Sequence, residues 1–79
     1  MYSTFFIIKI QKVGEIMGNR LQELRKKYKI TQQDLANNLG VSRQYISDIE
    51  RHKLVPSLLM AFKISDFLNV PVYEIFYIL

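Results

Sequence analysis

The chain has 79 residues, 49% of them hydrophobic and 13% aromatic, and a formal net charge of +4 at pH 7. This length suits one small domain, and the apolar content excludes wholesale disorder. With no cysteine, one histidine and scattered carboxylates, the sequence predicts no metal site, cofactor or catalytic motif, and is compatible with a cytoplasmic protein that is not an enzyme.

Residues 1–16 form an N-terminal extension that differs from the rest of the chain. The stretch 2–13 is rich in aromatic and β-branched residues, which favours a short N-terminal β-strand, and Gly14 ends that pattern. Its apolar run is interrupted by Lys9 and is too short to cross a membrane. The extension also lacks the basic start and cleavage site of a secretory signal.

Two interpretations of this extension stay open. In the first, the strand pairs with the apolar end Tyr77–Leu79 or with the same strand of a second subunit, because an open strand edge seeks a partner. In the second, Met17 is the natural start and the extension is a translated leader, because the codons of Gly14-Glu15 readily spell a purine-rich ribosome-binding site. Deleting residues 1–16 and measuring dimerisation separates the two.

From Asn19 onward the pattern becomes helical, with Leu21, Leu24 and Tyr28 on one face. After the central motif described next, a loop leads to Ser57, which is a plausible cap for a further helix. We expect that helix to bury Leu58, Ala61, Ile64, Ser65 and Leu68, to end at Asn69, and to be followed by a short helix that Pro71 opens and that returns Val72, Ile75 and Phe76 to the core.

Residues 31–50 predict two short helices joined by a tight turn. Thr31 caps the first helix, with Asp34 three residues later in a variant of the capping box. Gly40 accepts the positive φ that a helix end needs, and Ser42 caps the second helix almost at once. This helix-turn-helix arrangement offers its second helix to the major groove of DNA. The apolar contacts that hold the helices across one another come from Leu35, Leu39, Val41, Ile46 and Ile49.

The positive charge gathers around this motif. Residues 20–53 hold eight basic residues against four acidic ones, whereas residues 54–79 hold one lysine against two acids, a balance of −1. This placement suits binding to a phosphate backbone. The partner that the sequence predicts is therefore double-stranded DNA, with no membrane contact and no evident small-molecule ligand.

An ordered set of fragments with fixed spacing runs through residues 18–76: Leu24-Arg25, Ile30-Thr31-Gln32, Leu35-Ala36, Gly40-Val41-Ser42, Ile46-Ser47, Ile49-Glu50, Pro56-Ser57-Leu58, Ala61, Lys63-Ile64 and Leu68-Asn69-Val70. In these fragments the chain resembles the phage-repressor/Cro-like helix-turn-helix family, also called the XRE family of bacterial and phage regulators. The resemblance implies an all-α, compact five-helix bundle of the lambda-repressor-like type. It assigns residues 17–79 to a DNA-binding domain that usually works as a dimer.

The start of the second motif helix carries the candidate base-reading residues. Arg43 can grip guanine O6 and N7, and Gln44 can pair with adenine N6 and N7. Ser47, one turn further on, reaches a base or a phosphate. Asp48 can accept from cytosine N4, although nearby phosphates repel it.

Phosphate contacts are expected at both ends of the motif. The resemblance implies that Gln32, at the first helix N-terminus, meets a phosphate and braces the recognition helix. Tyr45 has two open interpretations: donation to a phosphate, or packing against the preceding helix. The full set of candidate phosphate ligands is Thr31, Gln32, Ser42, Tyr45, Arg51 and Lys53.

The resemblance also assigns structural roles. Arg25 and Glu50 occupy positions that form a buried or half-buried ion pair in many relatives. His52 stands where the family often has glycine, so we expect positive φ and a strained but intact helix end. An exposed apolar patch, and hence a dimer interface, is expected where relatives often carry charged or small residues, at Leu59, Met60 and Phe67.

The sequence therefore predicts a transcriptional regulator: a dimeric repressor that reads a pseudo-palindromic site through its recognition helix. An alternative stays open, namely an antitoxin-like interaction module that binds a partner toxin and regulates its own synthesis. The apolar end segments fit that alternative as well.

Overall fold

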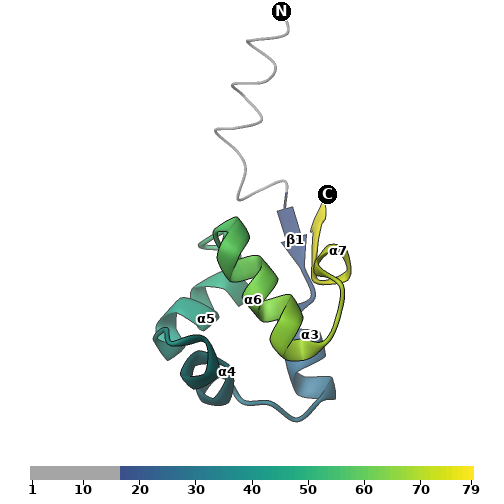
Figure 1. Cartoon of the computed structure of the whole chain (residues 1–79). Coiled ribbons are helices and arrows are strands. Elements are labelled where there is room, and N and C mark those ends of the chain that lie inside the picture. The colour runs from purple at the N-terminus through teal and green to yellow at the C-terminus, as the bar shows by residue number, and fades with distance from the viewer. Residues whose placement is uncertain (1–16) are drawn as a thin grey trace, which may run out of the picture.

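The computed structural model describes residues 17–79. The elements in chain order are β1 (Met17–Asn19), α3 (Leu21–Lys27), α4 (Gln32–Leu39), α5 (Arg43–Glu50), α6 (Leu58–Leu68), α7 (Val72–Ile75) and β2 (Phe76–Ile78). Within these residues the predicted five-helix bundle is confirmed, and a short two-stranded sheet extends it. Figure 1 shows α6 crossing the bundle, with α4 and α5 together on one side and β1 beside the C-terminal chain.

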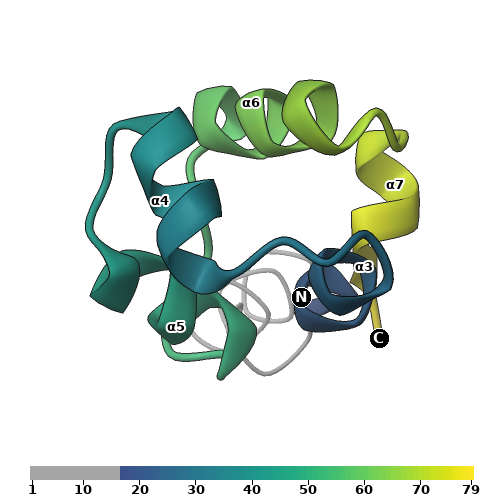
Figure 2. The same cartoon turned by 90° about the horizontal axis from the view of Figure 1, so that it is seen from below.

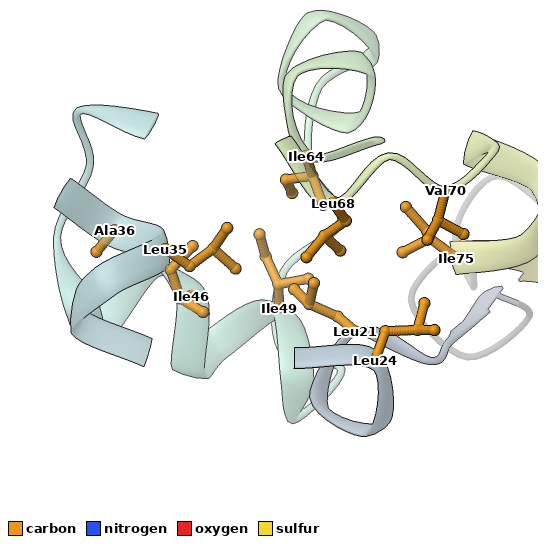
Figure 3. Close-up of a cluster of buried hydrophobic side chains, with 10 residues drawn as sticks. All are labelled: Leu21, Leu24, Leu35, Ala36, Ile46, Ile49, Ile64, Leu68, Val70 and Ile75. Carbon is orange, nitrogen blue, oxygen red and sulfur yellow. The ribbon is translucent and has the colours of Figure 1, made fainter. Parts of the chain in front are cut away.

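A single core joins all five helices. Figure 3 shows its side chains in one continuous row, from α4 and α5 past α3 and α6 to α7. Leu39 and Val41 are partly buried and pack against this core, as expected for the joint between the motif helices. The ten buried core residues are Leu21, Leu24, Leu35, Ala36, Ile46, Ile49, Ile64, Leu68, Val70 and Ile75.

Local side-chain chemistry sets the ends of α4 and α5. The Thr31 hydroxyl accepts from the Asp34 backbone N–H at 3.0 Å, and the Asp34 carboxylate accepts from the Thr31 backbone N–H at 3.1 Å, which confirms the capping box. These hydrogen bonds hold the pKa of Asp34 below its ordinary value. Gly40 ends α4 at φ 71°, and Ser42 caps α5 through the Tyr45 N–H at 3.0 Å. The turn between the motif helices is thus fixed from both sides.

A side-chain cap and a left-handed residue also set the two ends of α6. Ser57 caps its start by accepting from the Met60 N–H, and Asn69 ends it in the left-handed region at φ 57°. The Ser65 hydroxyl then donates to the Val70 carbonyl at 2.6 Å and ties the chain back onto the helix. The cap and the terminator predicted for this helix are confirmed. Of the predicted inner face, Ala61, Ile64 and Leu68 are buried and Ser65 is half-buried, but Leu58 is exposed.

The sheet is the main departure from the sequence analysis. Asn19 lies in β1 rather than in a helix, and α3 begins only at Leu21. β1 pairs antiparallel with β2, with Met17 opposite Ile78 and Gly18 opposite Tyr77. The end segment 77–79 therefore does find a strand partner, but it is Met17–Asn19; the strand expected within residues 2–13 lies outside the described residues.

At Gly18 the side chain of Tyr77 on the paired strand comes close to the backbone. A Cβ at Gly18 would lie 2.5 Å from Cε2 of the Tyr77 ring, so a side chain at this position would force the ring to move. Directly after β1, the Arg20 backbone N–H donates to the Ile75 carbonyl at 2.8 Å. These contacts join the first and last described elements of the chain.

Three predicted burial positions are wrong. Tyr28 follows the last residue of α3 and is 47% exposed, with its ring 5.6 Å from Lys27 Nζ. Leu58, the first residue of α6, is 71% exposed because the inward face begins one turn later, at Ala61. Met60, expected in the exposed patch, is partly buried and packs against the core. Within residues 17–79 no helix is long and apolar enough to cross a membrane.

Candidate nucleic-acid interface

Helix α5 presents one face to the core and its first turn to solvent. Ile46 and Ile49 are fully buried, which fixes the inner face, while Arg43 and Gln44 are exposed. Ser47 and Asp48 are half-buried further along the helix. Figure 2 shows α4 lying against α5, with the two helices side by side away from α7. The candidate base-reading residues thus divide into an exposed pair and a half-buried pair.

Gln32, the first residue of α4, contacts both ends of α5. Its Nε2 donates to Glu50 Oε1 at 2.9 Å, and its Oε1 accepts from Arg43 Nη1 at 3.1 Å. One amide therefore bridges the exposed start of α5 and its buried end. These two hydrogen bonds are the contacts through which Gln32 can brace α5, the role expected for it.

Arg25 and Glu50 form a two-pronged ion pair between α3 and the end of α5. Arg25 Nε donates to Glu50 Oε2 at 2.7 Å and Arg25 Nη2 donates to Glu50 Oε1 at 3.1 Å. The two side chains are only 9% and 2% exposed, and Arg25 Nη1 also donates to the Ile30 carbonyl. Such a paired, hydrogen-bonded arrangement is what allows charges to be buried.

Gln44 and Asp48 form a second side-chain pair along α5. Gln44 Nε2 donates to Asp48 Oδ1 at 2.9 Å, one helical turn away. This contact uses one of the two N–H groups of Gln44 and leaves its carbonyl oxygen free. Asp48 therefore orients the side-chain amide of Gln44, whether or not Asp48 itself contacts a base.

The candidate phosphate ligands differ in exposure and in the hydrogen bonds that they already make. The Thr31 and Ser42 hydroxyl oxygens accept backbone N–H groups as caps, so only their hydroxyl protons remain to donate outward. Arg51 and Lys53 are exposed, and neither forms an ion pair within residues 17–79. Tyr45 is half-buried against the core, and burial raises the pKa of its phenol, so its position favours the packing interpretation.

The end of α5 bears out one prediction and is contacted by one residue of β1 that sequence reasoning missed. His52 adopts φ 61°, as expected of a residue that stands in a glycine position. Asn19 was missed: its Nδ2 donates to the Ile49 carbonyl at 3.0 Å, and its Oδ1 accepts from the Leu21 N–H at 3.1 Å. The available signal was an asparagine just before a helix, where its side chain hydrogen-bonds to the backbone two residues further on.

Comparison with known proteins identifies the family. A family model described as Helix-turn-helix matches residues 21–75. The chain belongs to the helix-turn-helix family. This places it among DNA-binding regulators of transcription.

Individual relatives of this helix-turn-helix protein support the family assignment. The HTH-type transcriptional regulator MJ0272 of Methanocaldococcus jannaschii is 50% identical over 60 residues, which cover 76% of this chain and 91% of that protein. The immunity repressor protein of Bacillus phage phi105 is 37% identical over 59 residues, covering 75% of this chain and 41% of that protein. The restriction-modification controller protein C.AhdI of Aeromonas hydrophila has a crystal structure with TM-score 0.65 and 33% identity, covering 70% of this chain and 83% of that one.

The described part of this helix-turn-helix protein holds little that would suit a small ligand. Within residues 17–79 no group of three His, Asp or Glu side chains is placed to hold a metal ion. The pocket beside Asn19, His52 and Phe76 has a volume of about 10 Å³, which is space for a water molecule at most.

Proposed function

We propose that this protein is a sequence-specific, dimeric transcriptional repressor that reads a pseudo-palindromic operator through α5. The observation that carries the proposal is the exposed Arg43 at the start of α5, held by Gln32 at the N-terminus of α4. A helix N-terminus favours a phosphate, and the adjacent guanidinium can then reach a base edge in the major groove.

Repression and dimerisation have separate support. One relative bears the name immunity repressor protein, which supports a repressor rather than an activator. Leu59 and Phe67 are 64% and 37% exposed, which leaves apolar surface for a second copy. Two copies would place their α5 helices in successive major grooves, roughly 34–36 Å apart. The antitoxin-like alternative gains no support from the named relatives.

The assignment of base readers is tested by selecting bound duplexes from a random pool and measuring affinities for the selected site. We expect Arg43→Ala and Gln44→Ala each to lower discrimination at one base position by about 1–3 kcal/mol, because each side chain can make a bidentate base contact. Exposed Lys63 on α6 provides the matched control: Lys63→Ala removes the same charge as Arg43→Ala. If both α5 variants retained the parent's base preference, the assignment would be wrong.

A further inference from the structure

The Asn19 side chain makes hydrogen bonds to different parts of the fold, and its Nδ2 also lies 3.5 Å from Nδ1 of His52. Its Oδ1 accepts the Leu21 N–H two residues further on, in a turn that leads through the N-cap Arg20 into α3. Its Nδ2 donates across the molecule to the carbonyl of Ile49, next to the last residue of α5. One short side chain therefore links β1, the start of α3 and the end of the recognition helix.

The second contact acts at the carboxyl end of α5, beside the other contacts that hold this end. The Ile49 carbonyl also accepts from the His52 N–H at 3.1 Å, as the chain leaves the helix with His52 at φ 61°. Glu50, the adjoining residue, is the one held by Arg25 and Gln32. The end of α5 is thus fixed at two consecutive residues, by Asn19 on the backbone and by the ion pair on the side chain.

The orientation of α5 matters more for the proposed DNA recognition than the orientation of the other helices. A recognition helix must present its side chains to base edges within about 0.5 Å and about 10–20°, and this accuracy comes from packing and supporting hydrogen bonds. A residue that anchors the far end of α5 controls the angle at which its first turn meets the groove.

We propose that Asn19 is a positioning residue for DNA recognition, which sets the docking angle of α5 by tying β1 to its carboxyl end. This inference rests on the proposed function. Asn19 touches no DNA in this account; it acts through α5 on the residues that do. The prediction is a loss of sequence preference, beyond any loss of stability.

The two roles of Asn19 can be separated by substitution. Asn19→Ser keeps an accepting oxygen for the Leu21 N–H but is too short to reach the Ile49 carbonyl. Asn19→Asp keeps the acceptor and the shape, but replaces the donor with an oxygen that faces that carbonyl. Serine leaves the net charge unchanged, so its effect on non-specific binding to phosphates is small.

The experiment uses the full chain and two duplexes of equal length, one selected from a random pool and one of scrambled sequence. For Asn19→Ser we expect the ratio of the two affinities to fall by roughly three- to tenfold, because an α5 held at another angle weakens a bidentate base contact without abolishing it. Asn19→Asp lowers that ratio at least as far. Affinity for the scrambled duplex changes little with serine.

Ser65→Ala is the matched control. It removes another side-chain hydrogen bond to a carbonyl, from Ser65 to Val70, which does not involve α5. It lowers the midpoint of thermal unfolding and leaves the affinity ratio unchanged. If Asn19→Ser behaved in the same way, Asn19 would be structural only and the inference would fail.

A second readout is independent of DNA. Residual dipolar couplings of backbone N–H groups report the orientation of α5 relative to α6, and Asn19→Ser is expected to change them in α5 alone. Unchanged couplings overturn the inference. A parent protein that shows no preference between the duplexes overturns the proposed function instead, and the couplings then establish whether Asn19 holds α5.

Discussion

Glu50 is the residue on which the contacts of the recognition helix converge. Its carboxylate accepts from Arg25 Nε, Arg25 Nη2 and Gln32 Nε2, and the side chain is only 2% exposed. Through Gln32 it is also linked to Arg43 at the exposed start of the same helix. A residue without access to solvent is thus connected to one proposed to touch a base.

Removing this carboxylate is expected to be costly. Glu50→Ala leaves Arg25 buried without its partner, and the free energy of unfolding should fall by about 3–5 kcal/mol. The measurement is urea-induced unfolding, followed by circular dichroism.

Glu23→Ala serves as the comparison, because it breaks the Arg20–Glu23 pair on the exposed surface of α3. We expect almost no change in stability there, since solvent screens such pairs. Equal effects of the two substitutions would show that the burial of Glu50 does not matter.

At the scale of elements, the helix boundaries set by local chemistry could be predicted from the sequence. Thr31, Gly40, Ser42, Ser57 and Asn69 each act through neighbours within a few residues, so their spacing alone determines the outcome.

The sheet could not be predicted in the same way. β1 has only three residues, and its partner lies at the other end of the described chain. A strand this short has no periodicity to detect, and its stability depends on distant contacts. The Asn19 contact was missed for the same reason, since nothing local to Asn19 identifies Ile49 as its acceptor.

The capping box of α4 should make the stability of the fold depend on pH in the acid range. Hydrogen bonds from Thr31 favour the charged carboxylate, so the pKa of Asp34 is lower in the folded than in the unfolded chain. The contribution is complete above the ordinary pKa of 3.8 and is lost as the pH falls through the folded value.

The test compares the parent with Asp34→Asn, which keeps the shape of the side chain but does not titrate. The parent should unfold at a higher temperature than the variant above about pH 5, and the difference should shrink as the pH falls below about 4. A difference that stays constant down to about pH 2 would contradict this account of the cap.

At the scale of the whole molecule, the proposed dimer assigns the contact between two copies to one surface. The proposed dimer uses the exposed apolar face of α6, where Leu59 is 64% exposed. Leu59→Ser should weaken self-association, as measured by sedimentation equilibrium, because it removes apolar area from the interface. Tyr28→Ser, at another exposed apolar position, is the control and should leave the dimer intact. Unchanged association of the Leu59 variant would place the interface elsewhere.

The contact of Tyr77 with Gly18 has a consequence for the order of folding. Pairing β1 with β2 closes a loop that contains all five helices, and such a loop loses much chain entropy before any contact repays it. The contacts between α4 and α5, which are close in sequence, should therefore form first and the sheet last. Gly18→Ala displaces the Tyr77 ring, so it should speed unfolding and leave the refolding rate nearly unchanged in stopped-flow measurements. A slower refolding rate would mean that the two ends of the described chain meet early, and that the helices assemble inside a ring that is already closed.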